Sequence, residues 1–595
     1  MCPNMDWDSE ESSSDIPVKK EVSAKTRQAP TSISNNVERQ VEQATTQHEV
    51  KETTEPRAVD MPTTVEVQDQ SNPDDKSFLV ALAKDLPQST LDFLQAEKRT
   101  STQLSLESLV ELKRLLPPDR LVQLISEFFK IPLATNFTPD REVLKKHIVF
   151  FMAKNILPLS PTEFVIATPR LGTVIRRDLA KEGFQQVRFY VARKGIIAKA
   201  LRTAILSMRD KPQAVQDRIQ EHIGRGQFTK AVTEIISYAF RLYSSDLHFE
   251  RRDTHGVIRA RVDGILEDIC PLSADQYDRT IGAIYRLAET QQPSTRESAD
   301  GAFQVDGLPL QVRVSFFPSL HGTHNVVMRL LPASTDVPSG EDLGYSAEEW
   351  NGILKAVQKS SSGLVLLVGP TGSGKNSTIF SLLSSLDTRG KKLIEVADPI
   401  EYQHMLGIQA QLVETDKLQW RYADALRASL RHDPDMIAVG EIRDEESAKI
   451  ALDAARTGHL IFSTVHAETA FEAFDRLADL GCKIPYLLSA VKLVVAQRLL
   501  RKLCQNCFGD GCQKCVGGFT GRFAIAEVLT VTDALREEFN GQLPVTPKKR
   551  ADAARLHCPG YRTLLEAALQ AEKDKLTTRS EIERVLGQMD RRRPV

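Results

Sequence analysis

Apolar residues first recur at helical spacing near Phe78, in FLVALAKDL and then in LESLVELKRLLPPDRLVQLISEFF, where Pro117 and Pro118 mark a helix start. Farther along, the pattern predicts short strands in ILPLSPTEFVIATP and QVRFYVA, and helices in LGTVIRRDLAKEGF and KGIIAKALRTAIL. Alternation of this kind is typical of a compact mixed fold. The sequence therefore predicts a small α/β N-terminal domain over residues 77–208.

A polar stretch then separates this domain from a second mixed unit. Residues 209–227 are rich in charge, which predicts a linker or a solvated helix. Beyond them, DLHFERRDTHGVIRARVDGIL predicts a β-hairpin, and LQVRVSFF and HNVVMRLL predict further strands. We expect a second α/β domain over residues 228–340.

The third unit has a different pattern, because its strands are short and apolar throughout. They are GLVLLVGPTG, KKLIEVADP, DMIAVGE and HLIFSTVH, each closed by Gly, Pro or polar residues. Such strands alternating with helices predict a parallel sheet covered on both faces, with ligands at the carboxyl ends of the strands. We assign this core to residues 341–500, with YLLSAVKLVVAQRLLRKL as a helix at its end, a cysteine-rich element over 501–530 and a helical C-terminal subdomain over 531–595.

Composition adds the remaining boundaries. A chain of 595 residues exceeds one core, and residues 1–76 contain no leucine and a single aromatic residue, Trp7, which predicts a disordered acidic tail. A net charge of −2 gives no global basic excess, so stable nucleic-acid binding is not expected. The acidic start lacks the pattern of a signal peptide and no apolar run reaches the roughly 18 residues of a membrane span, so we expect a cytosolic protein.

Residues 369–378 read GPTGSGKNST, between the strand LVLLV and the helical stretch IFSLLSSL. This context predicts a phosphate-binding loop, although a glycine-rich turn that merely joins a strand to a helix is the simpler alternative. Lys375 is expected to reach the β and γ phosphates, while the backbone N–H groups converge on phosphate oxygens. The expected nucleotide-binding residues of this loop are Gly369, Pro370, Thr371, Gly372, Ser373, Gly374, Lys375, Asn376 and Ser377.

Asn376 departs from the usual pattern, because a Ser or Thr hydroxyl normally follows the loop lysine and binds Mg²⁺. Its amide oxygen is a possible magnesium ligand, and Ser377 is a possible substitute. We expect nucleotide binding to survive this change and the hydrolysis rate to depend on it. In DPDMIAVGEIRD, Glu441 ends an apolar strand, where a carboxylate can hold the Mg²⁺ shell or polarise a water.

GPTGSGK, ADPIEY, LRHDPDMIAVGEIRD and AARTGHLIFSTVHA occur in an order and spacing that resemble the type II secretion and type IV pilus assembly ATPases. The resemblance implies that Asp398 and Glu401 form an aspartate box, with Glu401 activating the attacking water. It makes Glu441 an atypical Walker B acid and matches His459 and His466 to a histidine box, with His466 as a γ-phosphate sensor. Ala397 stands where the family more often has an acid, which we interpret as a tuning change.

SSDLHFE, RVDGI, RVSFFP and VVMRLL extend the resemblance into the second domain. It implies a RecA-like P-loop ATPase domain preceded by a PAS-like α/β domain and a small α/β N-terminal domain of the kind found on assembly motors. Arg313 and Arg329 then become candidates to contact nucleotide phosphates across a domain or subunit boundary. The simpler alternative makes both arginines solvated or salt-bridged residues of a sheet face.

Cys504, Cys507, Cys512 and Cys515 form two CxxC pairs within a dozen residues. Four thiolates suit tetrahedral Zn²⁺ in a closed structural site, and in a reducing compartment ligation is expected in preference to disulfides. Free reduced thiols and an iron–sulfur cluster are the alternatives. The family's tetracysteine element has a longer stretch between the pairs, so this one resembles a trimmed version.

The resemblance therefore implies a homo-hexameric ATPase that uses ATP, Mg²⁺ and Zn²⁺ and converts hydrolysis into mechanical work for a type II pseudopilus or a type IV pilus. Its N-terminal domain would dock onto the cytoplasmic domain of an inner-membrane platform protein, which places the chain peripherally at the inner face of the bacterial cytoplasmic membrane. One alternative is an ATPase of the DNA-uptake or conjugation type. The other, suggested by Asn376, is a nucleotide-binding scaffold ring with weak hydrolysis.

Overall fold

The computed structural model describes residues 75–587 with gaps at 101–104, 113–114, 168–171, 291–293, 295, 333–337, 387–389, 399, 401–406, 413 and 416–417. The expected acidic tail lies outside the described residues, except for Asp75 and Lys76, which already belong to the first helix. Along the described chain, none of the helices combines the length and the apolar character that crossing a bilayer requires.

Four helices open the described chain and enclose a core of their own around Phe78, Leu82 and Leu94. The helical periodicity near Phe78 is confirmed, and Pro118 is the first residue of the fourth helix, as its missing N–H group favours. These helices are α1 (Asp75–Leu82), α2 (Gln88–Thr100), α3 (Leu106–Leu112) and α4 (Pro118–Phe129).

The next segment builds a small three-stranded sheet in the order β1-β2-β3, in which β2 pairs antiparallel with β1 and parallel with β3. Its alternating strands and helices confirm the predicted mixed fold. Phe151, Phe164 and Phe184 pack against one another in the core. The elements are α5 (Arg141–Lys146), α6 (Ile148–Lys154), β1 (Leu157–Pro158), β2 (Glu163–Ile166), α7 (Gly172–Lys181), β3 (Arg188–Val191) and α8 (Lys194–Ser207).

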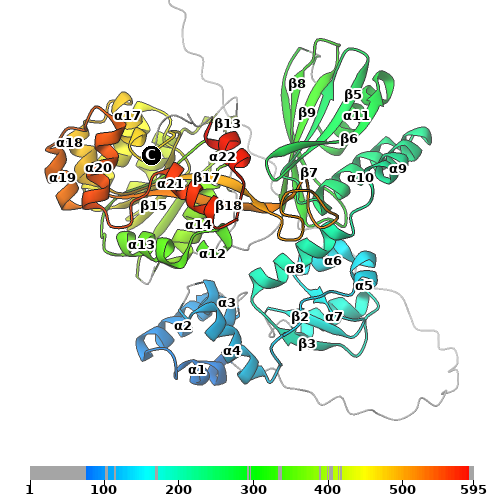
Figure 1. Cartoon of the computed structure of the whole chain (residues 1–595), viewed down its shortest axis with the longest axis horizontal. Coiled ribbons are helices and arrows are strands. Elements are labelled where there is room, and N and C mark those ends of the chain that lie inside the picture. Colours follow the sequence, from blue (N-terminus) through cyan, green and yellow to red (C-terminus); the bar gives the residue numbers. More distant parts are fainter. Residues whose placement is uncertain are drawn as a thin grey trace, which may run out of the picture. The chain divides into compact units, whose positions relative to one another are not determined.

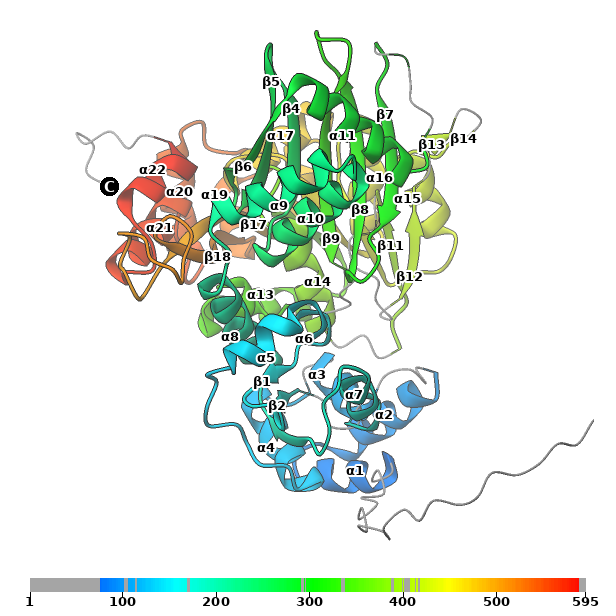
Figure 2. The same ribbon diagram turned by 90° about the vertical axis from the view of Figure 1, so that its right-hand side faces the viewer.

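The second domain is a six-stranded antiparallel sheet in the order β6-β5-β4-β9-β8-β7, with helices along one face (Figure 2). Burial alternates along β8, so every second side chain points away from the helices. The elements are α9 (Pro212–Gly224), α10 (Phe228–Arg241), β4 (Asp246–Arg251), β5 (His255–Val262), β6 (Ile265–Ser273), α11 (Ala274–Leu287), β7 (Ala299–Gln304), β8 (Leu310–Pro318) and β9 (His324–Pro332).

Helix α9 falls where the charge pattern predicted a linker or a solvated helix. A helix is present, but it is not solvated all round, because Val215, Ile219 and Ile223 are buried in the core of the second domain. Their i, i+4 and i+8 spacing forms a single apolar stripe. The many charged residues between them masked that stripe in the sequence.

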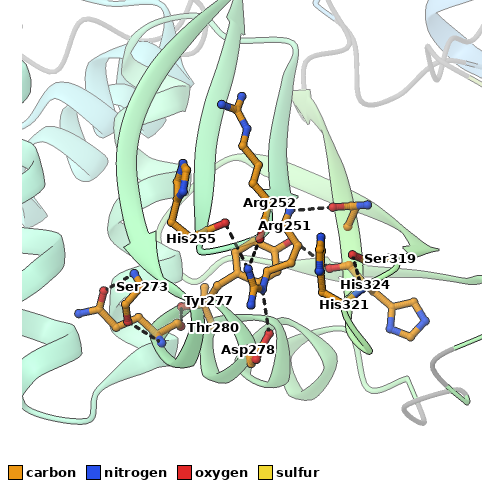
Figure 3. A network of polar contacts seen from close by, with 12 residues as sticks. Arg251, Arg252, His255, Ser273, Tyr277, Asp278, Thr280, Ser319, His321 and His324 are labelled. Atoms are coloured by element: carbon orange, nitrogen blue, oxygen red, sulfur yellow. Dashed lines mark hydrogen bonds and ion pairs between the residues drawn. The ribbon is translucent and has the colours of Figure 1, made fainter.

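A polar network fastens α11 to the sheet (Figure 3). The fully buried Tyr277 donates its hydroxyl toward the main-chain oxygens of Phe249 and His324, at 3.0 and 2.9 Å. Gly256 makes this possible, because a Cβ there would lie 2.1 Å from the Tyr277 ring. Every acceptor in this contact is main chain, so the network fixes the backbone of the domain.

The third unit is a seven-stranded sheet in the order β12-β11-β15-β16-β10-β17-β18, parallel except for the edge strand β18 (Figure 1). Alternate strand residues pack into two cores, one under α13 and α14 and the other under α16, α17 and α18. The expected parallel sheet buried on both faces is therefore confirmed.

The elements before the long hairpin of this unit are α12 (Gly340–Leu343), α13 (Ala347–Gln358), β10 (Gly363–Val368), α14 (Lys375–Ser385), β11 (Leu393–Ala397), β12 (Ile408–Gln411), β13 (Glu414–Thr415), β14 (Leu418–Gln419), α15 (Tyr422–Leu430), β15 (Met436–Val439), α16 (Glu445–Arg456), β16 (Leu460–Val465), α17 (Glu472–Asp479) and α18 (Ile484–Ala490). The hairpin and the helices after it are β17 (Val491–Leu503), β18 (Phe519–Thr530), α19 (Asp533–Phe539), α20 (Pro547–His557), α21 (Leu564–Lys573) and α22 (Arg579–Leu586).

The long helix expected for YLLSAVKLVVAQRLLRKL is wrong over its greater part. Helix α18 ends at Ala490, and the next thirteen residues form β17. Strand β17 pairs parallel with β10 and antiparallel with β18, so both of its edges are hydrogen-bonded. A run of apolar and basic residues fits either period, and this tertiary pairing decides the outcome.

Candidate functional site

The loop between β10 and α14 has the backbone that a phosphate-binding loop needs. Gly369, Gly372 and Gly374 have φ angles of 150°, 78° and 85°, which side-chain-bearing residues rarely adopt. Space is limiting as well, since a Cβ on Gly369 would lie 2.6 Å from the main-chain oxygen of Gln497. Because α14 begins at Lys375, its N-terminus and its dipole end in this loop.

Polar groups within the loop fit an anion. The Lys375 ammonium donates to the carbonyl oxygens of Gly369 and Pro370, at 2.8 and 3.0 Å, so the lysine is folded into the loop. The Ser373 hydroxyl is buried and finds no hydrogen-bond partner among the described residues. A buried donor without an acceptor is costly, and a phosphate oxygen is an acceptor of the required kind. The loop residues therefore fit the nucleotide that the sequence predicts.

Glu441 and His466 lie together just past the carboxyl ends of two neighbouring strands, β15 and β16. The His466 Nε2 atom lies 2.9 Å from one oxygen of Glu441, and the Arg443 Nε atom donates to the other oxygen at 2.8 Å. The carboxylate accepts the hydrogen bond from Arg443 and raises the pKa of that guanidinium. Glu441 thus has Arg443 bonded to one oxygen and the His466 ring close to the other, at the edge where a parallel sheet binds its ligands.

Asp398, one acid of the expected aspartate box, is exposed at the end of β11, and its N–H group donates to the Tyr422 hydroxyl at 3.1 Å. Burial raises the pKa of Tyr422 to about 12, so its hydroxyl stays protonated. Glu401, the other acid, lies outside the described residues, and its role stays a prediction.

The two histidines of the expected histidine box lie at opposite ends of β16. His459 precedes the strand, where its ring donates to the Ala454 carbonyl oxygen at 3.2 Å and its own carbonyl accepts the Gly363 N–H group. His466 follows the strand, about 20 Å away at the spacing of extended chain. His459 therefore does not join Glu441, and its contacts are those of a structural residue.

Asn376, in the first turn of α14, lines a shallow hollow between this helix and strands β11 and β15. Glu395, Ala397 and Gly440 are among the other described residues that line the hollow. Ala397 contributes a methyl group where a longer acid would fill the space. Asn376 therefore lies beside this hollow, and its amide oxygen is of the ligand type that Mg²⁺ accepts.

Arg313 and Arg329 lie directly opposite each other on β8 and β9 of the second domain. The row continues through Asp246 on β4 to Arg261 on β5. Asp246 lies 3.3 Å from Arg329 and 3.9 Å from Arg261, while Arg313 has no carboxylate partner in the part of the chain that the structure describes. Three cations with one anion cross the sheet face that the helices leave open.

The four clustered cysteines come together at the end of the β17–β18 hairpin, with all sulfur atoms within 4.8 Å of one another. The Cys504–Cys512, Cys507–Cys515 and Cys512–Cys515 sulfur pairs are 3.8, 3.6 and 3.6 Å apart. Four thiolates around one zinc at 2.3 Å would lie about 3.8 Å apart. A four-iron cluster would spread the sulfurs more widely, because each binds a different iron. The geometry fits one tetrahedral ion.

Comparison with known proteins agrees with this set of features. The model of the family described as "Type II/IV secretion system protein" matches residues 221–584, more than half of the chain. The chain belongs to this family. The resemblance that the sequence motifs predicted, to the ATPases of type II secretion and type IV pilus assembly, is thereby confirmed.

Three relatives illustrate the match. The type II secretion system protein HxcR of Pseudomonas aeruginosa is 38% identical over 322 residues, which are 52% of this chain and 67% of that protein. The protein transport protein HofB homolog of Escherichia coli is 34% identical over 63% of this chain and 84% of its own length. The type IV pilus assembly ATPase PilB of Thermus thermophilus is 33% identical over 59% of this chain but only 42% of its own length.

Among solved structures, the pilus retraction motor PilT with bound ADP is 28% identical and aligns over 60% of this chain and 97% of its own, with a TM-score of 0.44.

The sequence reasoning missed three residues of this family member. Arg443 was visible two positions after Glu441, a spacing that puts both side chains on one side of an extended segment. Arg261 appeared in RVDGI, but only the strand register aligns it with Asp246 and Arg329. Gln497 gave no signal, because its segment was expected to be helical.

Proposed function

We propose that this chain hydrolyses ATP at the carboxyl edge of its parallel sheet and converts the reaction into mechanical work for a type II pseudopilus or a type IV pilus. The observation that carries the proposal is the Glu441 carboxylate, held by His466 and Arg443 on the same sheet edge as the phosphate loop. The names of the relatives, which include a pilus assembly ATPase, support the cargo class.

In this proposal the loop N–H groups, Lys375 and Ser373 bind the phosphates, and Glu401 activates the attacking water. Mg²⁺ would neutralise phosphate charge and would be held through Asn376 or Ser377 and the Glu441 carboxylate. His466, which lies 2.9 Å from one oxygen of Glu441, would act as the γ-phosphate sensor. The position of Lys375, Glu441 and His466 at the carboxyl edge of the sheet supports these assignments.

Arg313 and Arg329, with Arg261, are proposed to contact nucleotide phosphates from the PAS-like second domain of the same or a neighbouring chain in a homo-hexamer. ATP and ADP would then favour different domain packings, which supplies the stroke. The N-terminal domain would dock onto the cytoplasmic part of an inner-membrane platform protein. The chain would act in the cytoplasm, peripherally at the membrane.

Phosphate release from purified protein tests the enzyme directly. We expect wild type to exceed Glu441→Gln by about 100-fold or more, since a single preorganised catalytic group contributes on that scale. Asn376→Thr, which restores the usual hydroxyl, should raise the rate further. Lys355→Ala, an exposed lysine on α13, is the control and should match wild type.

Equal rates for wild type and Glu441→Gln, with activity appearing only in Asn376→Thr, would instead identify the scaffold ring. Stimulation by DNA that disappears with added salt would favour the DNA-uptake alternative.

Zn²⁺ is proposed for the four cysteines, where a closed thiolate site would stabilise the end of the β17–β18 hairpin. Elemental analysis should find about one zinc per chain, and the double change Cys504→Ser with Cys507→Ser should remove it. Cys2→Ser, far along the sequence from the cluster, is the control. Absence of zinc from reduced, freshly purified wild type would contradict the assignment.

A further inference from the structure

Gln497 lies in the middle of β17 with no exposed surface, and its amide connects three separate segments. Its Nε2 atom donates to the Ser373 carbonyl oxygen in the phosphate loop at 2.7 Å. Its Oε1 atom accepts from the Thr378 hydroxyl on α14 at 2.7 Å, and also from the Tyr345 hydroxyl. One side chain therefore contacts the loop, the helix after it and the segment that precedes α13.

The orientation of this amide is fixed by its partners. The Ser373 carbonyl can only accept, so it requires the amide nitrogen, and the two hydroxyls then supply donors for the oxygen. Burial raises the pKa of Tyr345, so the phenol remains a donor. Because all these atoms are buried, an amide turned the other way would leave unsatisfied groups, each costly in a dry interior.

The backbone of Gln497 is fixed as tightly as its side chain. The main-chain oxygen accepts from Arg498 Nη1 at 3.0 Å, and Arg498 Nη2 donates to the Glu468 carbonyl oxygen at 3.1 Å. The loop packs closely against this position, because a Cβ on Gly374 would lie 2.8 Å from the Gln497 amide nitrogen. Both ends of the phosphate loop, at Gly369 and Gly374, therefore pack closely against Gln497.

Tyr345 connects this hydrogen-bonded cluster to the segment that joins the second domain to the ATPase domain. It follows Gly344, the left-handed C-cap of α12, in the chain segment between the last strand of the second domain and α13. That segment is the covalent route from the second domain into the ATPase domain. A shift of the loop at Ser373 would move the amide, and the amide would move Tyr345.

We propose that Gln497 is a positioning residue that holds the phosphate loop in its binding conformation and links loop occupancy to the segment entering the ATPase domain through Tyr345. The inference rests on the proposed function, since nucleotide must occupy this loop.

The test compares nucleotide affinity, measured with a slowly hydrolysed fluorescent ATP analogue, with kcat from phosphate release. Gln497→Leu should raise Kd about tenfold, as expected when a buried hydrogen-bonding group is lost. Tyr345→Phe should leave Kd within about twofold but lower kcat about fivefold, because only the link is cut. Tyr277→Phe, which also removes a buried hydroxyl (Figure 3), is the matched control and should change neither.

A double-mutant cycle shows whether the link runs through the amide. Adding Tyr345→Phe to Gln497→Leu should have no further effect on kcat, since the bond is already absent. A full additional fivefold loss would overturn the link. A Gln497→Leu variant that binds the analogue within twofold of wild type would overturn the positioning role. Failure of wild type itself to bind would instead overturn the proposed function.

Should Gln497→Leu not fold, Thr378→Val together with Tyr345→Phe removes both donors to the amide oxygen while keeping the side-chain volumes. Each change alone leaves one donor in place and should raise Kd less than about twofold, whereas the pair should raise it about tenfold. A pair effect no larger than the product of the single effects would contradict the proposal.

Discussion

The two large sheets of this protein differ in how far their charged side chains are paired with opposite charges. In the parallel sheet, the Glu441 carboxylate accepts a bond from Arg443 on one oxygen, and the His466 ring lies 2.9 Å from the other. In the antiparallel sheet, Arg313 and Arg329 face each other across a strand pair, and the row contains one carboxylate, Asp246. Among the described residues, the carboxylate of the parallel sheet is paired with a cation, and we call this site balanced. The row on the antiparallel sheet has more cations than anions, and we call it unbalanced.

Like charges directly opposite each other destabilise a strand pair by roughly 0.2–1 kcal/mol. The open face nevertheless keeps this arrangement in the middle of the sheet, on strands whose other face is well packed. A stability penalty retained at the surface is typical of a binding site, because an incoming anion relieves it. The difference supports the proposal that the arginines of the second domain contact nucleotide phosphates.

The strongest way to break this comparison is to remove the unbalanced cations. Arg313→Ala and Arg329→Ala should each lower kcat by about 1,000-fold, the lower end of effects seen for arginines that stabilise phosphoryl transfer. Thermal stability should be unchanged or slightly higher, because one of the two opposed positive charges is removed. Steady-state phosphate release and a thermal melt of each variant provide both readouts.

Arg279→Ala is the control for these variants. Arg279 lies on α11, on the other side of the same domain, and its guanidinium pairs with Asp275 at 3.1 Å. Its loss should leave kcat near wild type. If Arg279→Ala and Arg313→Ala behave alike, the row is an ordinary solvated face, as the simpler sequence interpretation held.

The sequence predicted the balanced site better than the unbalanced one. Gly369 to Lys375 and Glu441 follow apolar strands within a few residues, so local pattern alone placed them at one sheet edge. The charge row depends on register between strands far apart in sequence, such as β4 with β9. Single-strand patterns carry no information on register, so Arg261 could not be aligned with the other arginines.

Strand β17 shows a second limit of structure prediction from this sequence. VKLVVAQRLLRKL has no polar alternation, and its neighbours on both sides decide that it is extended. With the helical interpretation, Gln497 would have had no reason to meet Ser373, more than a hundred residues earlier. The same pairing places the cysteines at the end of a hairpin, although the CxxC spacing itself was recognisable without it.

Glu581 is a second balanced carboxylate, because it is buried and pairs with two arginines. Its side chain is fully buried on α22 and pairs with Arg501 of β17 and Arg584 at 2.8 and 2.6 Å. Glu581→Gln should reduce the free energy of unfolding by about 3 kcal/mol, since the largely buried Arg501 loses its carboxylate partner, whereas Arg584 is already exposed. Chemical denaturation measures the loss, and Glu583→Gln on the same helix is the control and should be near neutral.

The pH dependence of this pair has a definite sign. Burial alone would raise the pKa of Glu581, but hydrogen bonds from Arg584 and Arg501 outweigh it and lower the pKa to about 2. The folded-state pKa is below the unfolded value, so the stabilisation is complete above about pH 4.5 and declines as the pH falls toward about 2. Wild type should lose stability over that window, and Glu581→Gln should lose less.

The smallest effect is expected from Asp246, the single carboxylate of the charge row. Asp246→Asn should change the melting temperature little, because its ion pairs with Arg329 and Arg261 are partly exposed and weak, within about 1 kcal/mol together. It should increase the thermal stabilisation that pyrophosphate gives the full chain, and added salt should diminish that gain. Asp275→Asn makes the same charge change on the helical side and should leave the pyrophosphate effect at the wild-type value. Equal gains for the two variants would mean that the anion senses net charge alone, and the distinction between the balanced and unbalanced sheets would then have no functional meaning.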